Sequence, residues 1–394
     1  MTLEAGGKTL TGTTNASGVY VFSNVPYDLN AKVSWAGSNY WSEGSLSFSS
    51  DSSKTVTVNL SVLYDLIFAT GQQGVTVELT GGYTGTVTTG TDGNATFSKV
   101  PVTSVAYTVT KTDFETVTGT YSVSASVTDT SQTIQVPLTK LPKLVLITQT
   151  NDSYQLEDGY NYLSFLVVGP GGNGARYVST EGINGAGGGG GGMAYCKNIP
   201  YPIPVTNVWR LNITSSYSRI IWENNVVSVT CYKGANGSAY TGGRGGIVES
   251  SPTWHGGTLS KAGGTGGGGG GYANYVCGGG AGTNGQGFES RGGTGNDGTV
   301  SYEGGGQYKG DHGTPFNNST KFPIKTVFNG TGKGGDPFNN GGGGGGYGDG
   351  TKGGNNSPAG NAGYGAGGGG GNGGSSTGLG GQGIICLYYH NTPL

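Results

Sequence analysis

Short stretches in which apolar and polar residues alternate fill the first part of the chain. Two of them, residues 18–26 and 93–101, follow the turn signals Ser17-Gly18 and Asp92-Gly93. Alternation with a period of two places successive side chains on opposite faces of a β-strand, and Thr, Val and Tyr favour that conformation. Strands that recur roughly every ten residues predict a small β-sandwich.

The first part also contains an internal repeat. Residues 18–26 align with residues 93–101 at an offset of 75, and the closing alternation at 55–60 aligns with 133–138. The first copy has no counterpart of residues 74–76, which start the opening strand of the second copy. Either upstream residues or a neighbouring chain would supply that strand.

The repeated motif, Asp/Ser-Gly-x-x-x-Phe-x-x-Val-Pro, resembles that of the transthyretin-like, carboxypeptidase-regulatory group of Ig-like domains. The resemblance covers about 140 residues in both copies. It implies that the glycine makes a turn and that Phe22 and Phe97 pack between two sheets. We therefore expect two Ig-like β-sandwich repeats, at residues 1–62 and 63–142, which would serve as spacers.

The pattern changes near residue 142, because 72 of the 86 glycines follow it. Ordinary β segments, such as residues 162–170 and the closing strand near residues 384–390, alternate there with glycine. The pure glycine runs lie at residues 187–192, 266–271, 341–346 and 367–371. Residues 143–394 are therefore predicted to form a separate, glycine-rich β domain.

Two interpretations of the glycine runs remain open. Flexible linkers are rich in glycine, but they rarely alternate with Tyr, Phe, Trp and strand segments. The other interpretation is polyglycine II, a left-handed helix with three residues per turn and no internal hydrogen bonds, whose backbone groups must pair with neighbouring helices. A helix surrounded by others needs glycine at every position. We predict that pure runs form central helices and that the mixed stretches 242–246 and 373–378 form peripheral ones.

The order of elements carries a second resemblance. Residues 165–172 (Phe-Leu-Val-Val-Gly-Pro-Gly-Gly), a glycine run, a β-hairpin, further glycine runs and the closing Gly-Gly-Gln-Gly-Ile-Ile-Cys-Leu-Tyr-Tyr look like the glycine-rich domain of many phage tail-fibre and tail-tip proteins. The region is more loosely similar to the distal adhesin of T-even-like phages, which contains a polyglycine II bundle, and to the glycine-rich extracellular domain of one receptor tyrosine kinase family. The insert at residues 302–340 departs from the pattern.

This resemblance implies a non-catalytic adhesin of the virion tail. It implies recognition of a bacterial surface glycan or outer-membrane protein by loops between the glycine runs, and assembly into a homo-oligomer. Two alternatives stay open: a structural subunit of an extracellular filament or virion decoration, with a filament neighbour as partner, and a bacterial surface adhesin.

Composition and charge narrow the function classes. Charged residues make up 11% of the chain and the formal net charge is −2, without a basic patch, so we expect no electrostatic nucleic-acid binding. No apolar run approaches the roughly 18 residues that a membrane span needs. Met1 leads directly into a polar, strand-like segment, so we expect no signal peptide there.

The sequence offers little for catalysis. Its histidines are His255 and His312, in glycine-rich loops, and His390, after the last strand. No nucleophile–base pair or paired carboxylates accompany them. Residues 330–334 lack the spacing of a phosphate loop, and residues 292–300 approach the calcium-binding nonapeptide only once. We therefore expect no enzyme activity, no cofactor and no metal.

The four cysteines, Cys196, Cys231, Cys277 and Cys386, form no Cys-x-x-Cys pair, so a zinc site is not expected. Their even number allows two disulfides, with three connectivities. Buried free thiols are the other interpretation.

Aromatic and histidine side chains in glycine-rich loops are the candidates for receptor binding, because Tyr and Trp provide rigid, amphipathic contacts. Tyr272 and Tyr347 directly follow six-glycine runs, and we favour a role in capping the bundle for both. The receptor-binding candidates are Trp254, His255, Tyr302, Tyr308, His312, Phe316, Phe328 and Phe338.

Overall fold

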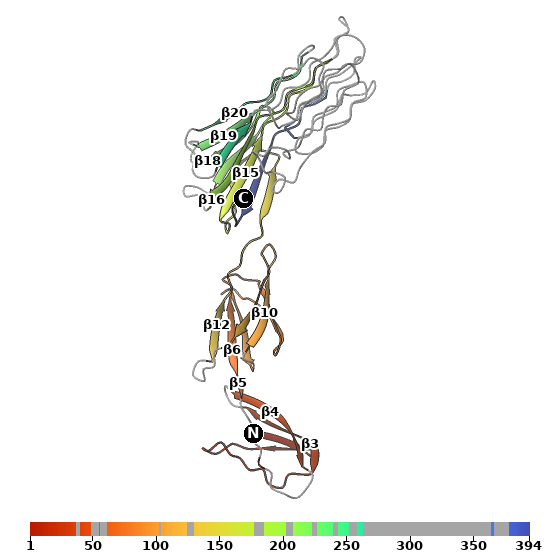
Figure 1. Cartoon of the computed structure of the whole chain (residues 1–394), viewed down its shortest axis with the longest axis vertical. Coiled ribbons are helices and arrows are strands. Elements are labelled where there is room, and N and C mark those ends of the chain that lie inside the picture. The colour runs from red at the N-terminus through yellow and green to blue at the C-terminus, as the bar shows by residue number, and fades with distance from the viewer. Residues whose placement is uncertain are drawn as a thin grey trace. The chain divides into compact units, whose positions relative to one another are not determined.

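The chain is all-β in the computed structural model (Figure 1). The structure describes residues 1–36, 40–48, 55, 61–101, 104–123, 130–176, 185–201, 208–222, 227–238, 243–251, 258–262, 364–365 and 378–394. Within these residues no helix is long and apolar enough to span a membrane. The chain divides into two compact units, Met1–Leu141 and Pro142–Leu394.

The first sequence copy forms one five-stranded sheet with the order β2-β1-β3-β4-β5. Leu3, Ala5, Ala31 and Val33 are buried on one of its faces, against the partly buried Phe22 and other apolar residues. The strands are β1 (Thr2–Ala5), β2 (Lys8–Thr11), β3 (Asp28–Ala36), β4 (Tyr40–Phe48) and β5 (Ser61–Val62).

The second copy forms two sheets, with the orders β11-β10-β7-β8 and β12-β6-β9. Phe68 and Phe97 of the second sheet meet edge to face, and Phe68 also contacts Tyr107 of the first sheet, so a common core lies between the two. The strands are β6 (Tyr64–Ala69), β7 (Thr76–Thr80), β8 (Gly85–Thr88), β9 (Asn94–Val100), β10 (Ser104–Thr110), β11 (Val117–Ser122) and β12 (Ser131–Gln135).

The structure supports the internal repeat and corrects one part of it. The strand order β2-β1-β3-β4 reproduces the order β8-β7-β10-β11, so the counterpart of β7 is present as β1. The strand without a described counterpart is β6. The strand predicted at residues 18–26 does not form, whereas its equivalent at 93–101 contains β9. The reason is that β9 pairs with β6, and a strand without a partner leaves its backbone groups without hydrogen bonds.

The Pro142–Leu394 unit contains a second sandwich, with the sheets β13-β22-β15-β16-β21 and β14-β17-β18-β19-β20. Trp209 and Trp222 stack at 4.7 Å between ring centroids and pack against Phe165 of the facing sheet. The closing strand β22 lies between β13 and β15, so the prediction of a terminal strand that returns to pair with an earlier one is confirmed. The strands are β13 (Lys143–Ile147), β14 (Asn151–Gln155), β15 (Tyr162–Val168), β16 (Met193–Pro200), β17 (Val208–Ile213), β18 (Tyr217–Trp222), β19 (Val227–Tyr232), β20 (Val248–Ser250), β21 (Thr258–Ala262) and β22 (Ile384–His390).

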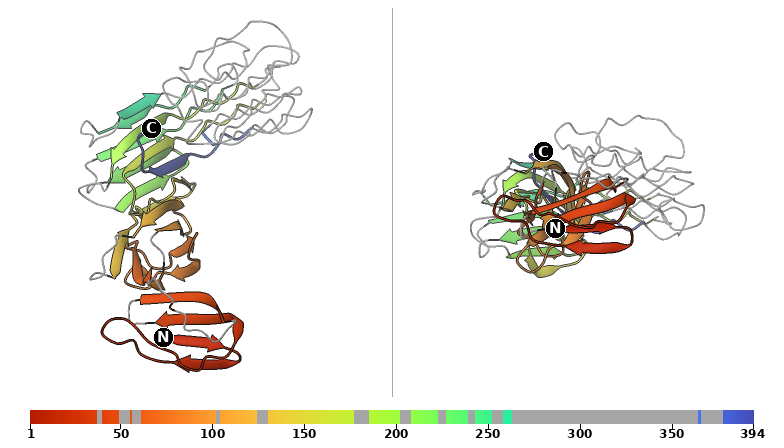
Figure 2. Two further views of the ribbon diagram at one scale, coloured as in Figure 1. Left: turned by 60° about the horizontal axis from the view of Figure 1, so that its bottom comes forward. Right: turned by 90° about the horizontal axis from the view of Figure 1, so that it is seen from below.

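Five extended segments, which we call the glycine segments, continue from one end of this sandwich (Figures 1 and 2). They adjoin β15, β16, β19, β20 and β22, and they comprise residues 169–176, 185–192, 233–238, 243–247 and 378–383. Backbone hydrogen bonds join them with a three-residue period. In segment 169–176, the amides of residues 169, 172 and 175 donate to segment 185–192, and those of 171 and 174 donate to segment 378–383. The carbonyls of residues 170 and 173 accept from segment 233–238.

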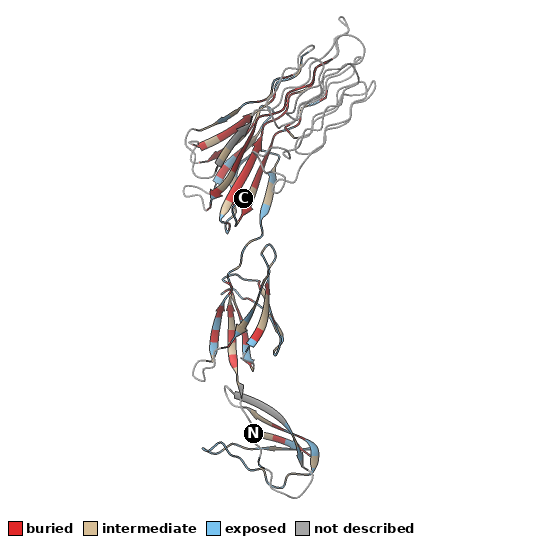
Figure 3. Cartoon of the chain, viewed as in Figure 1, coloured by how far each residue is buried: buried red, intermediate tan, exposed pale blue. Residues whose placement is uncertain are grey.

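This three-residue period is that of polyglycine II. Each residue pairs with a different neighbour in rotation, and no described glycine of the five segments has a positive φ. Segment 185–192 is buried along its whole length and is hydrogen-bonded to residues of four separate stretches (Figure 3). The pure run is therefore a central helix, as predicted, and the flexible-linker interpretation is wrong for the described segments.

Peripheral segments carry side chains at the positions that face outward. In segment 243–247, Gly243 and Gly246 are buried while Arg244 and Ile247 are exposed, and in segment 378–383, Leu379 and Gln382 are exposed. The prediction of a peripheral helix at residues 242–246 is confirmed for its described part. The runs at 266–271, 341–346 and 367–371 lie outside the described residues.

Glycine is required in the interior because the backbones approach closely. A Cβ placed on Gly172 would lie 1.9 Å from the carbonyl oxygen of Ala235, and one on Gly189 would lie 2.1 Å from that of Arg244. A Cβ on Gly191 would lie 2.0 Å from the oxygen of Gly169. Backbone atoms cannot move aside as a flexible side chain can, so these helices depend on the absence of side chains.

Candidate functional site

The receptor-binding residues expected from the sequence all lie outside the described residues: Trp254, His255, Tyr302, Tyr308, His312, Phe316, Phe328 and Phe338. The capping candidates Tyr272 and Tyr347 do so as well. Strand β21 (Thr258–Ala262) nevertheless divides the receptor-binding candidates into a group before it and a group after it in the sequence. Trp254 and His255 precede Thr258, which pairs with Lys197, whereas the remaining candidates follow Ala262, which pairs with Met193 beside the glycine segments.

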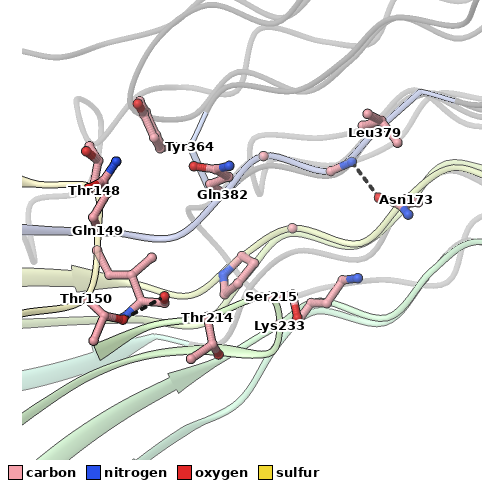
Figure 4. Close-up of a pocket in the computed structure, with 15 residues that line it drawn as sticks. Thr148, Gln149, Thr150, Asn173, Thr214, Ser215, Lys233, Tyr364, Leu379 and Gln382 are labelled. Carbon is pink, nitrogen blue, oxygen red and sulfur yellow. Dashed lines mark hydrogen bonds between the residues drawn. The ribbon is translucent and has the colours of Figure 1, made fainter. Parts of the chain in front are cut away.

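The described residues contain a groove where the sandwich meets the glycine segments (Figure 4). It has a volume of about 620 Å³ and is open to solvent. Two turns of the sandwich, one after β13 and one after β17, face the segments 169–176 and 378–383 across it. Its lining residues are Thr148, Gln149, Thr150, Pro170, Gly171, Asn173, Ile213, Thr214, Ser215, Lys233, Tyr364, Leu379, Gly380, Gly381 and Gln382.

Local hydrogen bonds fix the sandwich side of the groove. The Thr150 hydroxyl donates to the Ile213 carbonyl at 3.0 Å and accepts from the Ile213 amide at 2.9 Å, so it joins the two turns. The Thr214 hydroxyl accepts from the amides of Ser216 and Tyr217 at 3.2 and 3.0 Å. Threonine suits these positions because its side chain replaces backbone partners in a turn.

On the opposite side of the groove, which the glycine segments form, asparagine side chains accept hydrogen bonds from backbone amides. The Gly380 amide donates to Asn173 Oδ1 at 2.9 Å, and the Asn173 amide donates to Asn236 Oδ1 at 2.9 Å. These asparagines satisfy backbone donors at the surface of the glycine segments, where no further helix is described. The Gly365 amide donates to the Gln382 carbonyl at 2.7 Å, which places Tyr364 at the rim. Both walls are therefore held before any ligand arrives.

The chemistry of the groove is polar and weakly cationic. Hydroxyl and amide side chains predominate, Lys233 is the cation among the fifteen lining residues, and none of these residues carries a carboxylate. Tyr364 adds an aromatic ring that is partly buried, and Leu379 adds an apolar side chain with 57% exposure. Many hydroxyl and amide groups beside an aromatic ring match a saccharide, which is rich in hydroxyls on an apolar ring. The lysine favours an anionic one.

This groove does not include the histidine that the structure describes. His390, which the sequence placed after the last strand, is the last residue of β22 and is 1% exposed. Its Nε2 lies 2.9 Å from the Ser164 hydroxyl. The contact has the composition of a nucleophile and its base, but Ser164 is fully buried and its oxygen already accepts from the Asn198 amide at 3.0 Å. A substrate cannot reach this oxygen, so the pair is structural.

Neither a metal cluster nor a reactive thiol is found among the described residues. The described residues hold no cluster of His, Cys, Asp and Glu that could bind a metal. Cys196, Cys231 and Cys386 are buried free thiols, which confirms that interpretation for three of the four cysteines; Cys277 lies outside the described residues. Burial raises the pKa of the Cys231 and Cys386 thiols far above the usual range, so these thiols are poor nucleophiles.

The groove could not be found from the sequence, because its residues come from six stretches between 148 and 382 whose proximity depends on the return of β22. The only local signal is the cluster of Thr, Ser and Gln at the two turns. Comparison with protein families shows that residues 147–390 match the model of a glycine-rich domain. No curated protein matches the chain.

Proposed function

The chain belongs to the glycine-rich domain family through residues 147–390, and from this premise we propose that it is a non-catalytic adhesin of a phage tail fibre or tail tip. Its partner would be a bacterial surface glycan or outer-membrane protein. In this proposal the protein acts in a homo-oligomeric fibre at the virion tail, and the residues that connect glycine segments contact the receptor.

The observation that carries the proposal is the network of backbone hydrogen bonds that joins the glycine segments. Because main-chain groups hold these helices together, the bundle does not depend on the side chains of the residues that join one helix to the next. Such a scaffold tolerates sequence change in its connections while its own geometry stays fixed, which suits a protein whose receptor varies. Other rigid scaffolds also carry binding loops whose sequences vary while the scaffold stays unchanged.

The groove adds a second contact to this proposal. Its hydroxyl and amide groups, with Tyr364 and Lys233, fit an anionic saccharide of the bacterial surface. It lies beside the glycine segments, so a polysaccharide chain could occupy the groove while other parts of the receptor meet the connecting residues. Its described lining has neither a histidine nor a carboxylate.

The test is a cell-binding assay with the full chain joined to a fluorescent reporter. Bacterial strains would be compared for binding by wild type and by variants in which residues 302–340 or 252–257 are replaced with Gly-Ser linkers of equal length. Replacement of residues 223–226, between β18 and β19, is the control. We expect strain-selective binding that is lost on replacement of residues 302–340 and retained in the control.

A structural role is the second candidate, as a subunit of an extracellular filament or a virion decoration. The observation that favours it is the single described sheet of the first sequence copy, which leaves apolar residues at its surface. Absence of binding to every strain, together with filaments or virion attachment, would place this role first. A signal peptide in the parent gene would instead favour a bacterial surface adhesin.

A further inference from the structure

Strands β18, β19 and β20 lie side by side in the second sandwich (Figure 1). Ile220 of β18 and Val229 of β19 are buried in the core between the two sheets. Because side chains alternate along a strand, the residues next to them face away from that core. Arg219 pairs with Thr230, which pairs in turn with Glu249, so these three form one row across the outer face. This face therefore carries a cation and an anion on either side of a threonine.

A hollow of about 350 Å³, which we call the outer hollow, contains this row and is open to solvent. At one end Tyr217 and Tyr232 pair across β18 and β19, with ring centroids 6.4 Å apart. Serine hydroxyls line the other end. The outer hollow shares no lining residue with the groove beside the glycine segments, so it is a separate site. Its lining residues are Tyr217, Arg219, Ser228, Thr230, Tyr232, Glu249, Ser250 and Ser251.

Hydrogen bonds fix the side chains of the outer hollow. The Tyr232 hydroxyl donates to Glu249 Oε2 at 2.7 Å, which holds the ring and the carboxylate together. The Ser228 amide donates to the Ser251 hydroxyl oxygen at 2.8 Å. All of these residues except Ser251 belong to paired strands, which hold binding groups more precisely than loops do. The lining is therefore organised without a ligand.

Two charged groups of the outer hollow have bonding capacity left. Arg219 Nε is buried and has no hydrogen-bond partner among the described residues. Buried donors without a protein partner are uncommon, and one in a hollow open to solvent points to an acceptor on another molecule. The Glu249 side chain is exposed, and a carboxylate accepts several hydrogen bonds. A donor and an acceptor thus stand about 10 Å apart at their Cα atoms, which is two strand spacings.

We propose that the outer hollow binds a neutral saccharide. The Arg219 guanidinium can only donate hydrogen bonds, and the ionised Glu249 carboxylate can only accept them. A sugar hydroxyl does both, so one hydroxyl of the ligand accepts from Arg219 while another donates to Glu249. The apolar face of the sugar ring packs on Tyr217, as aromatic side chains with a polar edge allow.

The charge balance of the lining selects a neutral ligand. An anionic group attracted to Arg219 is repelled by Glu249, and a cationic group meets the opposite pair of forces. The groove differs, since Lys233 is its only lining charge and favours an anionic saccharide. The outer hollow thus adds a second class of saccharide to the proposed adhesin, on a face that the receptor-binding residues do not define.

The test uses the full chain, joined to a fluorescent reporter, on an array of immobilised neutral and acidic bacterial polysaccharides. We expect binding to at least one neutral polysaccharide. Tyr217→Ala and Arg219→Gln should each weaken that binding about tenfold, because they remove the ring contact and the charged donor. Tyr217→Phe keeps the ring and should retain most of the affinity. Arg210→Gln removes an exposed arginine of β17 outside the outer hollow and is the matched control.

Unfolding in denaturant, followed by tryptophan fluorescence, would check that each variant is folded, and Arg219→Gln keeps the test decisive if Tyr217→Ala unfolds. Absence of binding to every neutral polysaccharide would overturn the proposal. Equal affinity of wild type and Arg219→Gln would also overturn it. A loss in Lys233→Ala alone would assign the neutral saccharide to the groove instead. Unchanged cell binding after replacement of residues 302–340 would count against the proposed receptor contact and would leave the outer hollow standing.

Discussion

Ser164 and His390 are separated by 226 positions in the sequence, yet the Ser164 hydroxyl and His390 Nε2 form a hydrogen bond of 2.9 Å. His390 Nδ1 lies 2.7 Å from the Thr392 carbonyl, which can only accept, so Nδ1 carries the proton. In the neutral imidazole, Nε2 therefore accepts from the serine hydroxyl. The imidazole also stacks between Tyr162 and Tyr388. This arrangement joins β22 to β15, and burial of the ring favours its neutral form.

We predict that the stability of the Pro142–Leu394 unit falls in mild acid. Burial lowers the pKa of His390 below its usual value of 6.5, so the unfolded state binds a proton more readily than the folded state. The stabilisation is complete above pH 6.5 and is lost as the pH falls from 6.5 to the folded-state pKa. Denaturant unfolding at pH 7.5, 6.5 and 5.5 would measure this loss.

The matched variant is His390→Gln, whose amide can occupy the same space without titrating in this range. The free energy of unfolding of this variant should change less between pH 7.5 and 5.5 than that of the wild type. Equal pH dependence in both proteins would show that another group is responsible.

The glycine lattice and the closing strand were predictable because both follow from local sequence. Residues 187–192 have no side chain at six successive positions, as a helix enclosed by other backbones requires, and the aromatic and strand segments nearby argued against a flexible linker. The mixed stretch around Arg244 was recognisable as peripheral for the same reason. The absence of a side chain is visible at each position of the sequence, so this prediction needed no knowledge of the tertiary fold.

Long-range relationships were not predictable. The strand expected at residues 18–26 has the right alternation, but strand formation depends on a partner, and β6 has no described counterpart in the first copy. The burial of His390 depends on Ser164 and on two tyrosines from β15 and β22. The groove likewise forms only where the two turns lie beside segment 378–383, and no local sequence pattern predicts that proximity.

The buried thiols give a prediction on reactivity. In a Cys277→Ser chain, Cys196, Cys231 and Cys386 should not react with a thiol reagent at pH 8 until the protein unfolds, because all three are buried and burial raises the pKa of Cys231 and Cys386. Mass spectrometry before and after addition of denaturant would count the modified thiols. Rapid modification of the native chain would contradict the burial.

The groove gives a prediction on ligand charge. Lys233→Ala should weaken binding of anionic bacterial polysaccharides by about fivefold, the scale of one solvent-accessible charge contact, and should leave neutral polysaccharides nearly unaffected. The effect should shrink at high salt because exposed charges are screened. Lys32→Ala, which removes an exposed lysine of the other unit, is the charge-matched control. Equal losses in the two variants would show that net charge, and not the groove, controls binding.

Gly189→Ala is the sharpest test of the lattice. Alanine in place of glycine usually stabilises a protein by about 0.4–1 kcal/mol where the backbone permits it, because the unfolded chain loses freedom. At position 189 the φ angle permits alanine, but the added Cβ would lie 2.1 Å from the Arg244 carbonyl oxygen. We expect the Pro142–Leu394 unit to be destabilised by about 3 kcal/mol, as in overpacked cores. Denaturant unfolding, followed by the fluorescence of the buried Trp209 and Trp222, would measure the change.

The control for this variant is Leu379→Ala in a peripheral segment, where the side chain is largely exposed and truncation should alter stability by no more than about 0.5 kcal/mol. The sign of the Gly189→Ala effect decides between the two interpretations of the glycine runs. In a flexible linker the substitution would be neutral or stabilising. In a lattice of contacting backbones it must be destabilising, because the Arg244 carbonyl would have to move away to admit the methyl group. That movement strains the backbone hydrogen bonds around Gly189, such as the one from its amide to the Ala235 carbonyl, and the buried interior cannot replace them with water.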